Sequence, residues 1–404
     1  MKELGIYIHI PFCVRKCYYC DFISYPDKLD YQKEYIEKIK QEIREEQEVF
    51  KDADITTIYI GGGTPSIIDS KYIIEILEYL YKFIGKKDRE ITIEINPGTI
   101  NKTKLQDYKK AGINRISIGL QSSNDKILKT IGRIHNFEDF LKAYNLVVEE
   151  GVENINVDLM IGLPEQTIED IKQSINEVLN LKLKPKHISI YSLIVEENTQ
   201  LDKMLDEGKI TLPNDEYERK EYAYTKNTLE LNGYKHYEIS NFAQEGYESK
   251  HNVNCWKQKE YIGLGVAAHS YINGIRFSNT TNLPKYLKNE KFEIPNEKEI
   301  EELKKKIDKQ NNEYKLPLKI GIKTIHEIQN EEDMQNEYMI LGLRMLDGVK
   351  ISEFKQKFVE NPIYLFRKEL EKLVDEQLIE IDLDNIKLTR KGLDLANIVW
   401  EEFV

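Results

Sequence analysis

Short apolar runs alternate with helix-length amphipathic segments over the first half of the chain, and this rhythm limits the folds available to it. The strand candidates are Leu4–Ile10, Thr57–Ile60, Glu90–Ile95, Arg115–Gly119, Asn154–Met160 and His187–Ser192. Helical patterns lie between them, at Tyr31–Phe50, Ser70–Ile84, Lys102–Ala111, Phe137–Glu150 and Thr167–Leu181. Such alternation indicates βαβ units around a parallel sheet. Six units are too few to close an eight-stranded barrel, so we expect an α/β fold in the form of a partial (β/α)6 barrel.

Three of the four cysteines lie within eight residues, directly after the first strand candidate. Cys13, Cys17 and Cys20 have the spacing C-x₃-C-x₂-C. Three thiolates on one loop can ligate three irons of a [4Fe–4S] cluster, which leaves the fourth iron open to another ligand. A structural zinc site is the alternative, with His9 completing a Cys₃His set. His9, however, lies on a strand candidate, and the sequence has no second cysteine pair.

A glycine loop, Gly61-Gly62-Gly63-Thr64-Pro65, follows the second strand candidate. Consecutive glycines let a backbone approach a ligand closely and expose its amide N–H groups. The loop has no Lys of a phosphate loop and does not fit G-x-G-x-x-G, which argues against a nucleotide-phosphate site. We therefore expect either a cradle for a ligand beside the cysteines or a tight turn from strand to helix.

Polar side chains also occur at or just after the ends of later strand candidates, where ligands bind in parallel α/β folds. They are Glu94, Gln121, Arg133 and Asp158. Carboxylates there can bind a ribose diol or an ammonium group, and an Arg can bind a carboxylate through two hydrogen bonds. Each of them taken alone fits a satisfied surface residue equally well.

Charge and composition exclude several classes of protein. The net charge is −12, from 70 acidic and 58 basic residues, which argues against binding nucleic acid over the whole surface. No run of 18 apolar residues occurs, so we expect no transmembrane segment, and the N-terminus lacks the pattern of a signal peptide. Because a cluster loop needs reduced thiols, the expected compartment is the cytoplasm.

The length of 404 residues suggests a large domain with a smaller one. Residues 1–225 would form the barrel core with the cluster, and residues 226–295 an extension of short strands and loops punctuated by glycine. Residues 296–332 are rich in Lys and Glu and are interpreted as a charged insertion or linker. Residues 333–404 show three helical patterns and then two short strands, which predicts a winged-helix-like domain that acts as a lid or docking module.

Several motifs together resemble one family over nearly the whole chain apart from 296–332. They are Tyr7–Cys13, the GGGTPS loop, Ile113–Gln121, Asp158–Pro164 and His251-Asn252…Trp256. The family is the radical S-adenosylmethionine (SAM) group of oxygen-independent coproporphyrinogen III dehydrogenases and the related haem chaperones of the HemW type. The resemblance implies a [4Fe–4S] cluster, SAM as a second cofactor, and a helical lid formed by the C-terminal part.

The resemblance also implies roles for individual positions. Cys13, Cys17 and Cys20 would ligate the cluster. The first SAM site would be lined by Tyr7, Gly62, Gly63, Thr64 and Glu94. Gln121, Arg133 and Asp158 match positions that hold a second SAM in the dehydrogenases. If SAM is cleaved, an electron donor such as flavodoxin or ferredoxin is implied.

Two features favour the chaperone branch of this family. The dehydrogenases resemble C-x₃-C-x₂-C-x-C, whereas Phe22 stands at the place of their additional Cys. They also carry an extension before the first strand, where this sequence starts almost directly on it. A chaperone would bind haem as cargo, covalently or non-covalently, and deliver it to acceptors such as respiratory haem proteins. Its haem-linked H-N-x-x-Y-W motif reads His251-Asn252-Val253-Asn254-Cys255-Trp256 here, so His251 is the candidate haem ligand and Cys255 a second one.

Other functions stay open on the sequence. A dehydrogenase would decarboxylate porphyrinogen propionates by radical chemistry, and Phe22 weighs against it. A radical enzyme with an unrelated substrate would cleave SAM without affinity for haem. A zinc-stapled binding module would be colourless and contain stoichiometric zinc.

Overall fold

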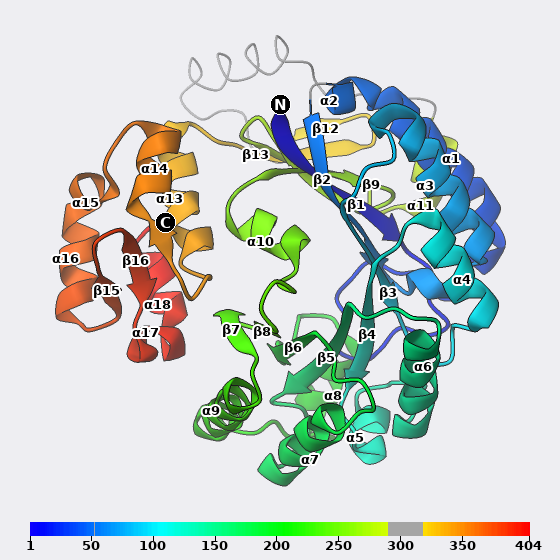
Figure 1. Ribbon diagram of the computed structural model, residues 1–404, viewed down its shortest axis with the longest axis horizontal. Coiled ribbons are helices and arrows are strands. Elements are labelled where there is room, and N and C mark those ends of the chain that lie inside the picture. Colours follow the sequence, from blue (N-terminus) through cyan, green and yellow to red (C-terminus); the bar gives the residue numbers. More distant parts are fainter. Residues whose placement is uncertain (52, 290–317) are drawn as a thin grey trace.

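Six parallel strands form the centre of the fold. They are β1 (Lys2–Ile10), β2 (Ala53–Gly62), β3 (Glu90–Ile95), β4 (Arg115–Gln121), β5 (Ile155–Ile161) and β6 (His187–Ser192). Each strand pairs in parallel with the next one along the chain. The structure is a computed structural model that describes residues 1–51, 53–289 and 318–404. The sheet curves with its outer face covered by helices, so the expected partial (β/α)6 barrel is confirmed (Figure 1).

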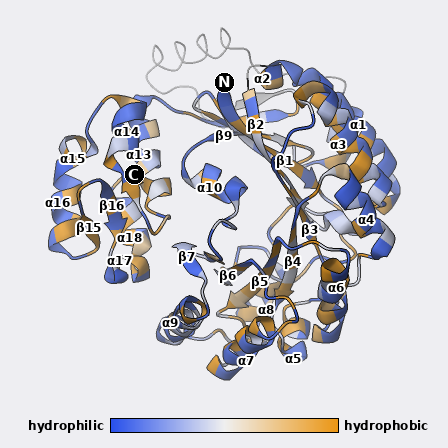
Figure 2. Cartoon of the chain, viewed as in Figure 1, coloured by the Kyte–Doolittle hydropathy of each residue, from blue (hydrophilic) through white to orange (hydrophobic). Residues whose placement is uncertain are grey.

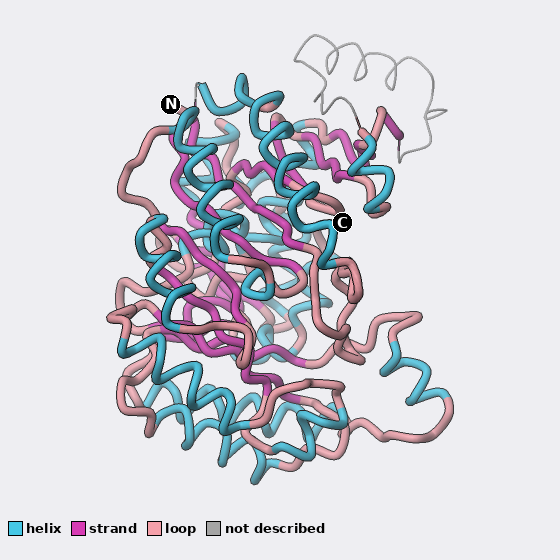
Figure 3. The backbone as a smooth tube through the Cα atoms, turned by 90° about the vertical axis from the view of Figure 1, so that its right-hand side faces the viewer, coloured by secondary structure: helices cyan, strands magenta, loops and turns pink. Residues whose placement is uncertain are grey.

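Helices cover one face of the sheet and leave the other face to the barrel interior (Figures 1 and 3). They include α1 (Gln32–Glu45), α2 (Gln47–Lys51), α3 (Ser70–Ile84), α4 (Lys102–Ala111), α5 (Asp125–Thr130), α6 (Phe137–Glu149) and α7 (Ile168–Leu179). Their apolar stripes lie toward the strands while the outer stripes are hydrophilic (Figure 2). Asn101, Asn136 and Thr167 cap α4, α6 and α7 through their side chains, which explains where these helices begin.

The two faces of the strands differ in chemistry because side chains alternate along a strand. In β1, Ile6, Ile8 and Ile10 are buried in the core beneath the helices, whereas Tyr7 and His9 lie on the other face. The same alternation makes the barrel interior polar on every strand. Its residues include Tyr7, His9, Thr57, Tyr59, Thr92, Glu94, Arg115, Ser117, Asn156, Asp158, His187 and Ser189.

Short strands from later in the chain extend the sheet on both sides, to thirteen strands within the described residues. On the β1 side they are β9 (Glu260–Leu264), β10 (His269–Ile272), β11 (Ile275–Asn279), β13 (Lys323–Ile328) and β12 (Leu318–Ile320). On the β6 side they are β8 (Asn241–Ala243) and β7 (Lys235–Glu238). The region expected as short strands and loops at 226–295 thus supplies sheet edges, together with α10 (Lys250–Trp256) and α11 (Leu283–Lys288).

The structure differs from the expected segment boundaries in two places. The boundary expected at residues 225 and 226 falls inside α9 (Asp215–Leu231), which follows α8 (Gln200–Asp206). Residues 318–328, expected within a charged insertion or linker, form β12 and β13; the remainder of that segment, up to residue 317, lies outside the described residues. The charge of Lys323 conceals the strand in the sequence, because its ammonium is buried in an ion pair with Glu46, the residue that follows α1.

The C-terminal domain has a separate apolar core and lies beside the open side of the barrel (Figure 1). It consists of α13 (Glu331–Gly342), β14 (Val349–Lys350), α14 (Ile351–Phe358), α15 (Pro362–Leu365), α16 (Arg367–Asp375), β15 (Ile379–Ile381), β16 (Asn385–Leu388), α17 (Arg390–Asp394) and α18 (Ala396–Glu401). The three strands pair in the order β14-β16-β15, so the winged-helix-like pattern gains a third strand and two final helices. No helix among the described residues is long and apolar enough to cross a membrane.

Candidate functional site

The cysteine loop begins where β1 ends, at the carboxyl end of the barrel strands. Cys13 is buried and Cys17 and Cys20 are half-buried, and all three line one cavity of about 370 Å³. The loop is tied to the segment between α5 and α6, because the Tyr18 amide donates to the Ile131 carbonyl at 3.0 Å. The Arg15 guanidinium donates to the Gly132 carbonyl at 2.9 Å. These contacts hold the three thiols over the barrel mouth.

The donor set around this loop fits a cluster better than a single zinc ion. No group of three or more His, Cys, Asp or Glu side chains in the described parts of the chain is arranged to hold one metal ion. A cluster spreads its thiolate ligands over several irons, so its ligands need not converge on one point. His9, the fourth ligand of the zinc alternative, has both ring nitrogens engaged, by the Tyr7 hydroxyl at 2.9 Å and the Ile23 carbonyl at 2.9 Å.

Burial favours the protonated form of two of the thiols, Cys13 and Cys20. It raises the pKa of Cys13 and raises the pKa of Cys20 to about 11, with the neighbouring Cys17 adding to the effect at Cys20. Polar groups that favour a charged sulfur stand nearby: the Arg133 guanidinium lies 3.6 Å from the Cys17 sulfur, and the Thr64 hydroxyl 3.5 Å from the Cys13 sulfur. Because a metal binds the thiolate, loading the site releases protons.

The glycine loop packs against the cysteine loop but does not offer its amides to a ligand. The Gly62 amide donates to the Glu94 carboxylate at 3.1 Å. The amides of Gly63 and Thr64 donate to the carbonyls of Ile10 and Phe12 at 2.9 and 2.8 Å. The expectation of exposed N–H groups is therefore wrong, because Glu94 of β3, the last residue of β1 and the cysteine loop accept these hydrogen bonds. A ligand contact here must come from carbonyl oxygens or from the Thr64 hydroxyl.

Close packing explains why glycine is needed in this loop. A Cβ on Gly63 would lie 3.0 Å from the Cys13 sulfur and 2.8 Å from the Phe12 carbonyl. A Cβ on Gly62 would lie 2.5 Å from the His9 ring, and Gly62 has a φ of 113°, which side chains rarely adopt. The cysteine loop can approach β2 only because both side chains are absent.

Two half-buried carboxylates line the cavity from β3 and β5. Glu94 accepts from the Tyr59 hydroxyl at 2.8 Å, and burial raises the pKa of Glu94 to about 7. Asp158 accepts from Ser117 at 3.1 Å and from Asn156 at 2.7 Å, and burial raises its pKa also. Both carboxylates line the same cavity as the thiols, as the strand-end rule predicts.

Gln121 and Arg133 complete the wall of this cavity. Gln121 ends β4 at a bulge in the pairing with β5 and has a φ of 71°. Arg133 donates to the Asn96 side chain at 2.7 Å and to the Gly119 carbonyl at 2.8 Å. Its Nε is buried with no acceptor among the described residues, so one donor of the guanidinium remains for a ligand or a water.

The structure brings together all the residues expected around SAM except Tyr7, which is not among the described residues lining the cavity. The Tyr7 hydroxyl is hydrogen-bonded to the His9 ring. The Tyr7 ring stacks on the Tyr59 ring, with the centroids 6.2 Å apart. Asn96 and Tyr191 line the cavity and are missing from the expectations. Both stand at the carboxyl ends of strands, so the strand-end position that indicated Glu94 as a site residue indicates these two also.

The two haem candidates lie at the opposite, amino-terminal end of the barrel strands. His251 and Cys255 are one helical turn apart on α10 and share its inner face. The His251 Nδ1 lies 2.8 Å from the Thr57 hydroxyl, its ring stacks on Tyr59, and burial lowers its pKa to about 4. Burial raises the pKa of Cys255 to about 11. Neither residue shares the cavity of the cysteine loop.

Comparisons with known proteins agree with this architecture. The sequence model of the radical SAM superfamily matches residues 7–178, and that of the HemN C-terminal domain matches residues 329–395. A haem chaperone HemW from Lactococcus lactis subsp. lactis is 34% identical over 100% of this chain and 98% of its own. The chain belongs to the haem chaperone HemW family.

Further similarities support the HemW family membership. A haem chaperone HemW from Bacillus subtilis is 34% identical, with 98% of each chain covered. The solved structure of coproporphyrinogen III oxidase (HemN) from Escherichia coli, a radical SAM enzyme, aligns with a TM-score of 0.79 at 22% identity. That alignment covers 100% of this chain and 90% of HemN, and it shows a common fold.

Proposed function

We propose that this protein is a haem chaperone that holds a [4Fe–4S] cluster and SAM at the mouth of its barrel, binds haem, and delivers it to acceptor proteins. Membership of the HemW family supports the haem function. The observation that carries the cofactor part is the convergence of three thiols with two half-buried carboxylates on one cavity. The acceptors would be haem proteins such as those of respiration.

Cys13, Cys17 and Cys20 would hold the cluster, which when bound supplies an open iron for SAM and an electron for its cleavage. Arg133 would stabilise negative charge on the Cys17 sulfur, which it already contacts. Glu94 and Asp158 would accept hydrogen bonds from hydroxyl or ammonium groups of SAM. Gly62, Gly63 and Thr64 would let SAM approach the cysteine loop, with Gln121 on the opposite wall.

The motif by itself favours His251 as the haem ligand, with Cys255 as the alternative. Both side chains point into the protein from α10, and the Nδ1 of His251 is held by Thr57. Ligation of haem iron by either residue therefore requires α10 to turn or to separate from β2. The neutral imidazole favoured by the low pKa of His251 is the form that binds iron.

The cofactor proposal is tested by anaerobic purification, cluster reconstitution, and analysis of iron, sulfide and visible absorption. We expect about four irons in the wild type. Cys17→Ser should lose the cluster, whereas Cys255→Ser, a cysteine outside the loop, should retain it. An intact cluster in Cys17→Ser, or zinc in place of iron in the wild type, would contradict the assignment.

The haem proposal is tested on the same preparation by titration with haemin and transfer to an apo-haem protein. Saturable uptake followed by transfer is expected, with weaker uptake in His251→Ala if the motif supplies the ligand. Incubation with coproporphyrinogen III, SAM and a reductant should give no decarboxylated product. Product formation without haem uptake would replace the chaperone by a dehydrogenase, and SAM cleavage without either would indicate a radical enzyme with another substrate.

A further inference from the structure

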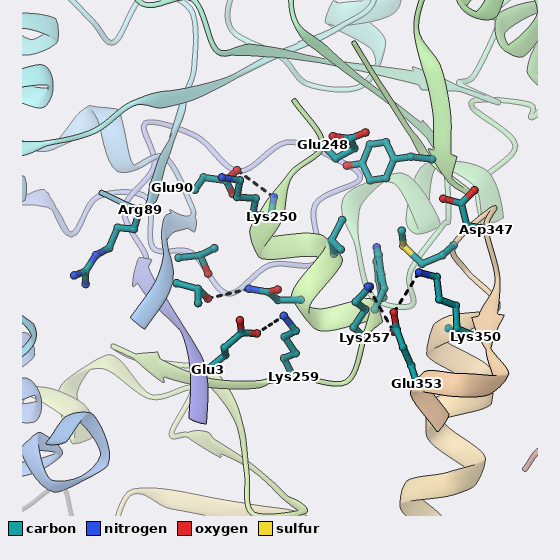
Figure 4. Close-up of a pocket in the computed structure, with 18 of the residues that line it drawn as sticks. Glu3, Arg89, Glu90, Glu248, Lys250, Lys257, Lys259, Asp347, Lys350 and Glu353 are labelled. Carbon is teal, nitrogen blue, oxygen red and sulfur yellow. Dashed lines mark hydrogen bonds and ion pairs between the residues drawn. The ribbon is translucent and has the colours of Figure 1, made fainter. Parts of the chain in front are cut away.

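A second, larger cavity lies at the amino-terminal end of the barrel strands and is lined in part by α10 (Figure 4). His251 is not among the described residues that line it. The volume of the cavity is about 830 Å³, compared with about 370 Å³ at the cysteine loop. The walls come from β2, from α10, and from the turn between α13 and β14 in the C-terminal domain. A cavity of this size accommodates a ligand of several hundred daltons.

The cavity has an apolar part wide enough to contact a planar ligand. Seven apolar or aromatic side chains line it, namely Ile55, Tyr237, Val253, Trp256, Tyr338, Met345 and Val349. They come from both the barrel and the C-terminal domain, so a ligand between them would contact apolar groups on two sides. The indole N–H of Trp256 is buried and has no acceptor among the described residues, so a ligand or a water must satisfy it.

Lysine ammonium groups stand at both ends of α10, in a cavity lined by seven acidic and seven basic residues. The Lys250 ammonium makes no hydrogen bond or ion pair that the described residues record, although its backbone N–H is held by Glu90 at 3.1 Å. At the other end, Lys257 and Lys350 share a single carboxylate, Glu353, at 3.6 and 3.5 Å (Figure 4). Two ammonium groups on one carboxylate leave a net positive charge. Each end of α10 can therefore accept a carboxylate of a ligand.

The cavity is held together by contacts between α10 and the C-terminal domain. The Arg344 guanidinium, after α13, lies 4.3 Å from the Trp256 ring and 5.1 Å from the Trp400 ring. Lys357 of α14 donates to the Gln258 side chain at 2.7 Å, just beyond α10. These contacts fix the cavity face of α10, which carries Lys250, Val253, Trp256 and Lys257, toward the C-terminal domain.

We propose that this cavity is where haem binds as cargo, with the macrocycle between α10 and the C-terminal domain and its propionates on Lys250 and on the Lys257–Lys350 pair. This inference rests on the proposed chaperone function and names a place for its cargo. It differs from the motif-based expectation, because His251 and Cys255 lie on the face of α10 turned away from the cavity. It also separates haem from the cysteine loop, so loading of either site leaves the other accessible.

The test is a titration of the reconstituted protein with haemin and with haemin dimethyl ester. Val253→Trp fills the cavity from α10, and Val374→Trp, on the half-exposed face of α16, is the matched control. We expect Val253→Trp to weaken haemin binding about tenfold or more and the control to bind as the wild type. The cluster absorption serves as the measure of folding, because the cysteine loop is at the opposite end of the barrel.

A charge variant provides a second readout that does not require repacking. Lys250→Glu should weaken haemin binding while leaving the dimethyl ester, which lacks carboxylates, unaffected. If Val253→Trp and Lys250→Glu bind haemin with wild-type affinity and only His251→Ala loses affinity, haem does not bind in this cavity. That result would overturn the proposed haem site but leave the chaperone function intact. Absence of haemin uptake by the wild type would instead remove the proposed function itself.

Discussion

The imidazole of His251 stacks on the phenol ring of Tyr59, with the ring centroids 5.2 Å apart and the planes inclined by 30°. The Tyr59 hydroxyl in turn donates to Glu94, which lines the cavity of the cysteine loop. Two side chains of β2 and β3 thus connect α10 to the proposed SAM site through the barrel interior. A change in the position of α10 would first alter the stacking of His251 on Tyr59 and then the hydrogen bond from Tyr59 to the Glu94 carboxylate.

Glu94→Gln should make the stability of the protein less dependent on pH. Burial raises the pKa of Glu94 in the folded state to about 7, from an ordinary value of 4.5. Between these values the unfolded chain releases its proton while the folded chain keeps it, so the contribution of Glu94 to stability falls as pH rises and is lost above pH 7. The full difference is roughly 3 kcal/mol.

Urea unfolding of wild type and Glu94→Gln at pH 5 and pH 8 measures this effect. The glutamine variant should gain stability relative to the wild type at the higher pH. Tyr59→Phe removes the donor that lowers the pKa of Glu94, so it should extend the wild-type decline to higher pH. An identical difference between wild type and Glu94→Gln at both pH values would exclude a titrating Glu94.

Gly62→Ala should destabilise the fold and prevent cluster assembly. The new Cβ would meet the His9 ring at 2.5 Å in a backbone conformation with φ of 113°. Strain and overlap together should cost about 3 kcal/mol or more. Gly85→Ala is the matched control, because Gly85 also has a positive φ of 67° but no atom within 4 Å of the added Cβ, so about 1 kcal/mol is expected. Equal losses of stability in the two variants would show that backbone strain alone is responsible.

Lys323→Met should destabilise the protein strongly although it replaces a charge by an apolar group. The Lys323 ammonium lies 2.6 Å from Glu46, and the side chains are only 3% and 2% exposed. Burial raises the pKa of Glu46 to about 7 even with Lys323 present. Removing one partner of a buried pair typically costs about 3–5 kcal/mol.

Chemical denaturation measures this cost against Lys142→Met, which breaks an exposed pair with Glu138 and should change stability by less than about 1 kcal/mol. Combining Lys323→Met with Glu46→Leu should recover part of the loss, since Glu46 is then no longer an unpaired buried carboxylate, although buried Glu42 still lacks the nearby charge of Lys323. If the double variant is as unstable as Lys323→Met, the unpaired Glu46 is not the cause.

Arg344→Leu should loosen α10 without unfolding the barrel. Arg344 lies between the rings of Trp256 and Trp400, and each cation–π contact of a desolvated guanidinium is worth about 1–2 kcal/mol. Hydrogen exchange should accelerate in α10 and remain unchanged in β2 and β3. Arg367→Leu, which removes an exposed Arg paired with Glu371, should leave α10 as it is in the wild type. Unchanged exchange in α10 of Arg344→Leu would show that other contacts position this helix.

The central strands were predictable because their signal is local. Glu90–Ile95 and His187–Ser192 agree end for end with β3 and β6, since β-branched residues that alternate with polar ones favour a strand whose one face is buried. The edge strands are shorter, so fewer of their residues show the alternation of apolar and polar side chains. β13 was missed because its first residue, Lys323, is neutralised by a carboxylate 277 positions away, a contact that no local window contains.

The sequence by itself determined the three thiols on one loop, the strand and helix rhythm, and the strand-end position of Glu94 and Asp158, because each depends on neighbouring residues. Only the tertiary structure decided which polar groups are already satisfied. The Gly62 amide is taken by Glu94, 32 residues away, and His251 by Thr57, 194 residues away. Whether a buried group is free to bind a ligand depends on such distant partners, since a hydrogen bond made within the fold removes the donor from the site.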